Sequence, residues 1–467
     1  MPTDDGDDPT DGITSVSRRR MLELSGVGLA GLAGCSSGGS EGDPTTTEPT
    51  ETTEPTETTE PTETTTSEVE AGFDTSVLAN SPSSDIAPAD GFADVSWLAD
   101  ADLNVVKVTN LDASGEGSLR WALKQTGPTL IVFEVGGVID LEREHLRPVQ
   151  PQTFVAGQTA PSPGITLIRG SFDINADDFI VQHLRVRPGD DFEGPTQFDG
   201  INNGAGTNVV VDHCTITWAT DENLSVAAEE EDENTTYTNN IVAECLADSL
   251  HPKGIHPYGS LVNDDNERVL LGGNLWANNL ARVPRLKGGT TTAVVNNVMY
   301  NFTRGTNLGG GTENETLATI VGNYYRGGPD TPDDDPMIGT TFTDASGPIE
   351  AYIAYNTTDP TSLQMLKAGV QITQVTQRPV WPEDLAVGHD GTYDAVLSAV
   401  GARPADRTHH DERVLTDVRE RTGGYIDSQS EVGGYPDLEA TERTLDVPAS
   451  ARAEWLAEFT AAVEAGE

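Results

Sequence analysis

The sequence predicts an all-β fold, a right-handed parallel β-helix followed by short C-terminal helices. Short runs rich in β-branched residues recur roughly every 25 to 35 residues, and each holds two brief strands joined at a polar corner that often contains Asn or Gly. No helical periodicity recurs between the runs, which disfavours alternating strands and helices. Propeller blades would need longer hairpins, so stacked solenoid turns with asparagine ladders at the corners fit the pattern best.

The runs can be laid over one another along the middle of the chain. They are "FIVQHLRVR" from Phe179, "VVVDHCTITW" from Val209, "YTNNIVAE" from Tyr237, "VLLGGNLWANN" from Val269, "AVVNNVMYNF" from Ala293, "ATIVGNYYRG" from Ala318 and "AYIAYNTT" from Ala351. Cys214 and Cys245 fall in or beside these runs. Two thiols without a CxxC pair make neither a disulfide framework nor a zinc site, so we expect both to be small buried hydrophobes.

The C-terminal part of the chain changes character after about residue 380. The stretches "DAVLSAVGA", "DERVLTDVRERTG" and "ASARAEWLAEFTAAV" have helical spacing and charged faces. We expect helices here that pack on the solenoid or cap it, because the end of a β-helix is an open sheet edge.

The N-terminal region predicts export. "SRRRML" carries a twin-arginine pattern, and the apolar run after it is too short for a transmembrane helix. It ends in "LAGC", which resembles a lipoprotein processing box with Cys35 as the lipid-bearing residue; a plain signal peptide is the alternative. The Thr/Glu/Pro tract that follows cannot bury a core and is typical of an extended stalk, whose threonines are potential sites for O-linked sugar. The expected domains are residues 1–35 (signal), 36–71 (stalk), 72–380 (β-helix) and 381–467 (C-terminal extension).

The charge balance limits the classes of partner that the chain is expected to bind. The formal net charge is −49, with 27 basic residues against 76 acidic ones. Such a chain is a poor binder of nucleic acid, which needs clustered cations, and lacks a polybasic membrane-surface patch, so we expect membrane contact only through the lipid anchor. Excess acid with few lysines indicates adaptation to high salt, where self-repulsion is screened; an ordinary acidic secreted protein is the alternative.

Three carboxylates form a candidate cation site. Asp199 and Asp221 are 22 positions apart, close to one solenoid turn, and Glu222 follows Asp221. Turns stack about 4.8 Å apart, where two carboxylates repel unless a cation lies between them. Oxygen ligands of this kind suit Ca²⁺. The alternative is that these aspartates are corner residues that bond their own backbone.

Scarce cations gather in the next two turns. "LHPKGIHPYG" supplies His251, Lys253 and His256, and "ARVPRLKGG" supplies Arg282, Arg285 and Lys287. The offsets from Asp221 to Lys253 and on to Arg282 are 32 and 29, each about one turn, so carboxylates, lysine and arginines are expected along one face. That face would bind a metal and a polyanion side by side, although an outward salt bridge is equally compatible with Arg285.

Residues 100 to 437 resemble the polysaccharide lyases of the pectate lyase type, family 1. The resemblance rests on "VTNLDASGEGSLRWAL", "IVFEVGGVIDL", "VAGQTAPSPGITL", "RVRPGD", "VVVDHCTITWATDENLSV", "HPKGIHPYGSL", "NLWANNLARVPR" and "DERVLTDVRERTGGYIDSQSEVGGYP", in the family's order. It implies a lyase that cleaves an acidic polysaccharide such as polygalacturonate by Ca²⁺-assisted β-elimination. A β-helix hydrolase of the polygalacturonase type and a non-catalytic carbohydrate-binding surface protein are the alternatives. The sequence leaves the oligomeric state open.

The resemblance also implies residue roles. It gives Ca²⁺ to Asp199 and Asp221, with Glu222 as a substitute for an aspartate that the family often has where this chain has Ser225. Lys253 falls on the substrate-binding lysine and Arg282 on the arginine usually assigned as the base. Lys287 replaces a second arginine, and we place Arg285, His251 and His256 with the substrate-binding groups.

Replacing Cys35 tests the predicted anchor. Cys35→Ser removes the only thiol of the processing box, so the variant is expected in the medium while the parent stays with the membrane fraction. The measurement is immunoblotting of both fractions. Equal partitioning of the two proteins would rule out the lipid anchor.

Overall fold

The computed structural model describes residues 73–227, 233–340, 346–367, 369–386 and 391–466. The predicted export signal, Cys35 and the stalk at 36–71 lie outside the described residues. Within the described ranges, no helix combines the length and apolar character needed to cross a membrane. The boundaries proposed for the domains stay predictions.

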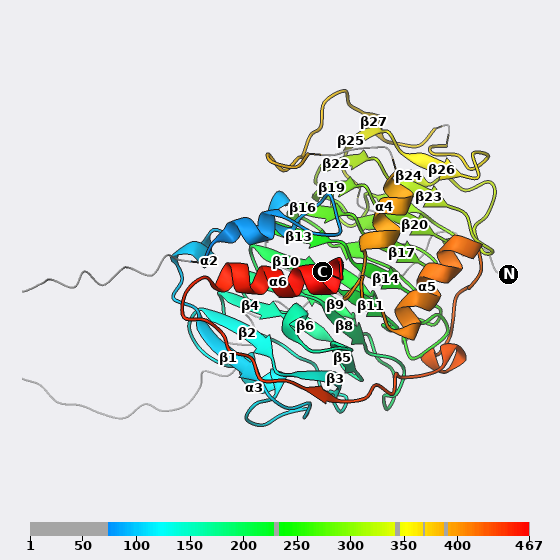
Figure 1. Cartoon of the computed structure of the whole chain (residues 1–467). Helices are drawn as coiled ribbons and strands as arrows, with labels where there is room; N and C mark the ends of the chain where they lie inside the picture. The colour runs from blue at the N-terminus through cyan, green and yellow to red at the C-terminus, as the bar shows by residue number, and fades with distance from the viewer. Residues whose placement is uncertain (1–72, 228–232, 341–345, 368, 387–390, 467) are drawn as a thin grey trace, which may run out of the picture. The chain divides into compact units, whose positions relative to one another are not determined.

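The predicted parallel β-helix is confirmed (Figure 1). From β4 to β24, each turn contributes one strand to each of three sheets, and the chain then climbs to the next turn, as from β7 through β8 and β9 to β10. Among the described strands, every pairing is parallel except that of β28 with β3. Residues one turn apart are therefore direct neighbours across a ladder.

The strands are grouped here by sheet. Sheet 1 contains β1 (Asn104–Val108), β2 (Thr129–Phe133), β4 (Thr153–Ala156), β7 (Phe179–Gln182), β10 (Val209–Asp212), β13 (Glu233–Thr238), β16 (Glu267–Gly272), β19 (Thr291–Val295), β22 (Thr316–Val321), β25 (Ile349–Ala354) and β27 (Thr373–Gln374). Sheet 2 contains β28 (Thr441–Glu442), β3 (Val135–Asp140), β5 (Ile165–Ile168), β8 (Leu184–Arg187), β11 (Thr215–Thr217), β14 (Ile241–Ala243), β17 (Leu275–Ala277), β20 (Val298–Tyr300), β23 (Tyr324–Arg326) and β26 (Thr357–Asp359). Sheet 3 contains β6 (Phe172–Ile174), β9 (Ile201–Asn203), β12 (Leu224–Val226), β15 (Leu261–Val262), β18 (Arg285–Leu286), β21 (Thr306–Leu308) and β24 (Ile338–Thr340).

Helices cover the sides of the solenoid. They are η1 (Thr75–Ala79), η2 (Pro88–Asp90), α2 (Trp97–Asp100), α3 (Leu119–Ala122), η3 (Gly157–Thr159), α4 (Thr392–Ala399), α5 (His409–Glu420), η4 (Gln429–Val432) and α6 (Arg452–Glu464). Apolar side chains of α4 and α5 pack on the outer face of sheet 2, and those of α6 pack on sheet 1 (Figure 1). The predicted C-terminal helices are therefore present and pack on the sides. At one end of sheet 2, the short strand β28 pairs with the edge strand β3.

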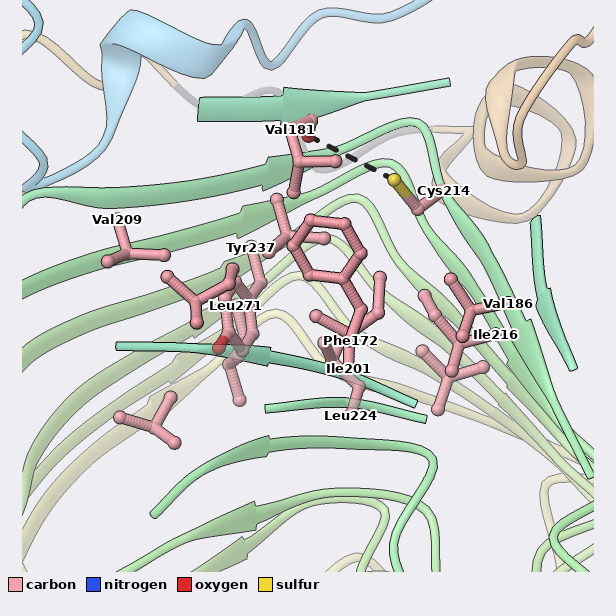
Figure 2. Close-up of a cluster of buried hydrophobic side chains, with 14 of the residues drawn as sticks. Phe172, Val181, Val186, Ile201, Val209, Cys214, Ile216, Leu224, Tyr237 and Leu271 are labelled. Atoms are coloured by element: carbon pink, nitrogen blue, oxygen red, sulfur yellow. Dashed lines mark hydrogen bonds between the residues drawn. The ribbon is translucent and has the colours of Figure 1, made fainter. Parts of the chain in front are cut away.

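The core fills the space between the three sheets. Figure 2 shows side chains from all of them meeting in the interior, among them Val181 and Val209 of sheet 1, Val186 and Ile216 of sheet 2, and Ile201 and Leu224 of sheet 3. Cys214 joins this cluster, and both Cys214 and Cys245 are free and buried, as predicted. Side chains alternate in direction along a strand, so those that do not point into the core lie on the outer faces of the sheets.

The predicted asparagine ladder runs along the corner between sheets 1 and 2. The Asn240 amide donates to Asn274, and the chain of bonds continues through Asn297 and Asn323 to Asn356, at 2.9–3.2 Å. Each member also accepts a backbone N–H of the turn before it and donates to a strand carbonyl, as Asn297 does with Asn274 and Leu271. The ladder therefore satisfies buried backbone groups that the corner would otherwise leave unpaired.

Removing one rung tests this role. Asn297→Leu leaves the Asn274 N–H and the Leu271 carbonyl without their partners, and each buried unsatisfied group costs about 1–3 kcal/mol. The urea midpoint is expected to fall clearly. The control Asn80→Ala, at an exposed asparagine after η1, should stay within about 0.5 kcal/mol of the parent. Equal midpoints would mean that the ladder contributes nothing to stability.

Candidate active site

The outer face of sheet 3 carries the predicted site. Strand pairing of β9 with β12, together with isolated bridges, aligns Asp199, Glu222, Tyr258 and Ala281 in successive turns. The sequence prediction paired Asp199 with Asp221, but the register is one residue later and sets Glu222 opposite Asp199. Asp221 is the adjacent residue, so all three carboxylates still meet.

The three carboxylates are close together. One oxygen each of Asp199, Asp221 and Glu222 lies within 4.8 Å of the others, and the Glu222 N–H donates to Asp199 at 3.0 Å. Burial and the nearby charge of Asp221 raise the pKa of Asp199 well above its usual range. Both causes disfavour a second negative charge here. A divalent cation between the carboxylates would offset this repulsion.

Asp221 is held by two histidines. His256 Nε2 lies 2.8 Å from one Asp221 oxygen, and His251 Nε2 lies 3.7 Å from the other. Burial would raise the pKa of Asp221, but the contacts with His251 and His256 outweigh it and keep the pKa below its usual value. The two imidazoles are buried and stack with their centroids 3.8 Å apart, and the Gln197 amide lies 3.1 Å from His251. Asp221 therefore stays ionised.

Arg282 completes the cluster. It is buried, it forms an ion pair with Glu222, and its guanidinium lies over the Tyr258 ring at 4.2 Å from the centroid. Tyr258 in turn packs against His256, with ring centroids 4.1 Å apart. A continuous stack of rings thus links the histidines that hold Asp221 to the arginine that holds Glu222, which fixes the direction of the guanidinium.

The other predicted cations lie around this cluster. Lys253 lies in the loop before Tyr258, not in the aligned column; it is exposed, and its charge contributes to the lowered pKa of His256, for which burial is the main cause. Arg285 lies on β18 in register with Leu261 and is buried. Lys287, two residues further along, pairs with Asp264 and donates to Asn263 at 3.1 Å.

The cluster offers two different sets of metal ligands. Asp199, Asp221 and Glu222 present only carboxylate oxygens, which suit Ca²⁺, and Ser225 is buried in the neighbouring strand β12. Asp221, His251 and His256 present mixed nitrogen and oxygen donors, which suit a transition metal. Both sets share Asp221, which contacts His256, and the all-oxygen set also includes Glu222, which pairs with Arg282.

Two groups in the site were missed by the sequence prediction. Tyr258 lies inside the quoted segment "LHPKGIHPYG", and an aromatic ring next to two histidines was the available signal. Gln197 precedes Asp199 by two residues and carries no recognisable pattern. Further along sheet 3, a cavity of about 290 Å³ is lined by groups that include Arg304, Asn307 and Lys367. This cavity is separate from the acidic cluster.

Comparisons with known proteins give relatives over most of the chain. No family model matches it. A probable pectate lyase C of Aspergillus flavus is 32% identical over 349 residues, covering 72% of this chain and 78% of that protein. A probable pectate lyase C of Emericella nidulans is 36% identical over 258 residues, covering 55% of each chain. Among solved structures, a thermostable pectate lyase has a TM-score of 0.48 at 15% identity and covers 65% of this chain and 92% of that chain.

Proposed function

The chain belongs to the pectate lyase family and is a polysaccharide lyase, and on that premise we propose that it cleaves polygalacturonate by calcium-assisted β-elimination. The observation that carries the proposal is the meeting of Asp199, Asp221 and Glu222 beside Arg282 on one face of the solenoid. Such a face combines a place for a cation with a fixed guanidinium, and both supply the positive charge that binds a chain of uronate carboxylates.

We assign calcium to the three carboxylates. Asp199 and Asp221 would hold it, with Glu222 as the third carboxylate in place of the aspartate that the family often has at the position of Ser225. When bound, calcium supplies positive charge that neutralises a substrate carboxylate and makes the neighbouring C–H more acidic.

The basic residues of this chain orient the polymer. Lys253, exposed in its loop, is proposed to pair with the substrate carboxylate next to the reacting carbon. Arg285, on β18, and Lys287, directly after β18, would contact the neighbouring sugar. Arg304 and Lys367, in the cavity beyond, would accept the chain further from the bond that breaks. Arginine pairs with a carboxylate through two N–H groups, whereas lysine acts as a point charge.

The reaction removes a proton and breaks one bond. A base takes the C5 proton, its electron pair becomes the C4–C5 double bond, and the C4 oxygen leaves with the other half of the polymer and gains a proton. No water is added, so one product carries an unsaturated end. Arg282 is proposed to stabilise the negative charge that develops on the carboxylate and C5.

Three groups are candidates for the base. Arginine normally remains protonated, so Arg282 in that role would need its proton removed first. His251 and His256 lie in the same stack but are engaged with Asp221, and hydroxide from solvent is the third candidate.

The lyase proposal is preferred over the two alternatives. Hydrolysis by paired carboxylates requires one acid and one base on opposite sides of the bond, separated by about 5–9.5 Å. Here the three carboxylates share a single cluster and are engaged by histidines and an arginine. A non-catalytic binding protein would not need this arrangement.

We also propose that the enzyme works outside the cell, exported by the twin-arginine route and held by lipid at Cys35. The location fits a polymeric substrate, which cannot enter the cytoplasm intact. The acidic composition supports activity at high salt, where the repulsion within a chain of net charge −49 is screened.

Arg282→Lys tests the proposed chemistry. Polygalacturonate, methylated pectin and other polyuronates are incubated with the parent, and the unsaturated product is followed by ultraviolet absorbance. The parent should form it from polygalacturonate, and Arg282→Lys should lower kcat on the order of 10² or more with little change in KM. The matched control Arg419→Lys, on the exposed surface of α5, should retain parental kinetics.

Two outcomes would contradict this account. Reducing sugar released without ultraviolet absorbance would identify a hydrolase. If Arg282→Lys raises KM and leaves kcat unchanged, Arg282 is only a uniform binding group, and the base is then sought first at His251 and His256.

A further inference from the structure

The turn that carries Lys253 lies between two buried histidines. His251 and His256 flank it and are only 4% and 3% exposed, whereas Pro252, Lys253 and Ile255 between them are exposed. A lysine with a long flexible side chain is therefore carried by a short segment that is anchored in the protein on both sides.

Two hydrogen bonds of this turn end on His251. The Gly254 N–H donates to the His251 carbonyl at 3.0 Å, which closes a β-turn with Pro252 in its second position. The Lys253 N–H donates to Nδ1 of the His251 ring at 3.2 Å. The ring nitrogen thus acts as an Asn or Asp side chain does in many turns, where it bonds the backbone two residues further on. The place of the Lys253 main chain therefore depends on where the His251 ring lies.

The His251 ring is itself held by its neighbours. It stacks on the His256 ring, with centroids 3.8 Å apart and planes 8° apart, and His256 Nε2 lies 2.8 Å from one Asp221 oxygen. At its edge, His251 Nε2 lies 3.1 Å from the Gln197 amide and 3.7 Å from the other Asp221 oxygen. One buried ring therefore connects the turn of Lys253 to a carboxylate of the proposed calcium site.

The contacts of His251 favour a positioning role over that of the base. Because Nδ1 accepts the Lys253 N–H, this nitrogen carries no proton and its lone pair is engaged. The neutral ring then carries its proton on Nε2, the atom that faces Asp221 and the Gln197 amide. In this arrangement neither nitrogen is available to take a proton from a substrate.

We propose that His251 is a positioning residue that acts through Lys253. Its buried ring holds the turn in place, so that the lysine is presented beside the acidic cluster before the polymer arrives. Holding the turn in advance avoids the entropy that is lost when a loop becomes ordered on binding. The contact between Lys253 and a substrate carboxylate rests on the proposed function, whereas the holding of the turn by His251 does not.

A double-mutant cycle tests whether His251 acts through Lys253. The kcat/KM for polygalacturonate is measured in saturating Ca²⁺ for the parent, His251→Leu, Lys253→Ala and the double variant. His251→Leu should lower kcat/KM at least about tenfold in the parent but less than about twofold when Lys253 is already alanine, because the group that it positions is then absent. His251→Asn, whose side-chain oxygen replaces Nδ1 as the acceptor, should recover part of the loss. The matched control His409→Leu, at an exposed histidine of α5, should retain parental kinetics.

Limited trypsin digestion examines the turn without relying on lyase activity. Trypsin cuts after lysine, and cutting inside a folded chain requires local opening. The Lys253–Gly254 bond should be cut at least about tenfold faster in His251→Leu than in the parent and in His409→Leu, as followed by mass spectrometry of the fragments. The bond after the exposed Lys124 is the internal reference and should be cut at the same rate in all three proteins. If His251→Leu is cut faster there as well, His251→Phe replaces it, since phenylalanine keeps the stack on His256 and lacks the acceptor.

Two results would overturn the proposal. One is an equal loss of kcat/KM on replacing His251 with and without Lys253, which would mean that the two residues act independently. The other is an equal rate of cutting after Lys253 in the parent and in the His251 variant. A parent that cleaves no polyuronate would contradict the proposed function instead, and the trypsin result would then decide alone whether His251 holds the turn.

Discussion

Parallel pairing between successive turns is the constraint on which the rest of this molecule depends. Each strand bonds to the strand one turn before it, so every outward residue has a neighbour about 4.8 Å above and below it. The column of Asp199, Glu222 and Tyr258 arises in this way, and so do the asparagine ladder and the stacked His183 and His213. The backbone register alone brings together groups that are 20 to 60 positions apart in the sequence.

Stacking places like residues next to one another, and their chemistry decides whether this stabilises the fold. Asparagines stack well because each amide both donates and accepts. Carboxylates repel, so the acidic column on sheet 3 is balanced by Arg282 and by His256. The stacked histidines are balanced by Asp212 and Glu464, which come from the solenoid and from α6. The outer face of sheet 3 differs from the other two faces in carrying charges where those faces carry helices.

The sequence predicted what depends on repetition and local pattern. The spacing of the runs predicted the solenoid, and the corner asparagines predicted the ladder. Helical periodicity predicted α4, α5 and α6. The residues of the site were predicted, but their register was not. The sequence alone does not show whether one turn spans the 22 positions from Asp199 to Asp221 or the 23 positions from Asp199 to Glu222, because the conformation of the connecting corner decides this. Lys253 was assigned to the column from its spacing to Asp221, but it lies in a loop outside the column. Glu464 could not be paired with His183 because nothing local relates the end of a helix to a corner 281 residues earlier.

The central claim is that the register gathers Asp199, Asp221 and Glu222 into a calcium site on which activity depends. Its most direct test is the free Ca²⁺ concentration at which polygalacturonate cleavage reaches half its maximum, measured for the parent, Asp199→Asn and the control Asp177→Asn, an exposed aspartate of a neighbouring turn. The account predicts that chelation abolishes parental activity and that Asp199→Asn needs at least about tenfold more Ca²⁺, with the control unchanged. Full activity after exhaustive chelation, or identical Ca²⁺ dependence in Asp199→Asn and the parent, would contradict it.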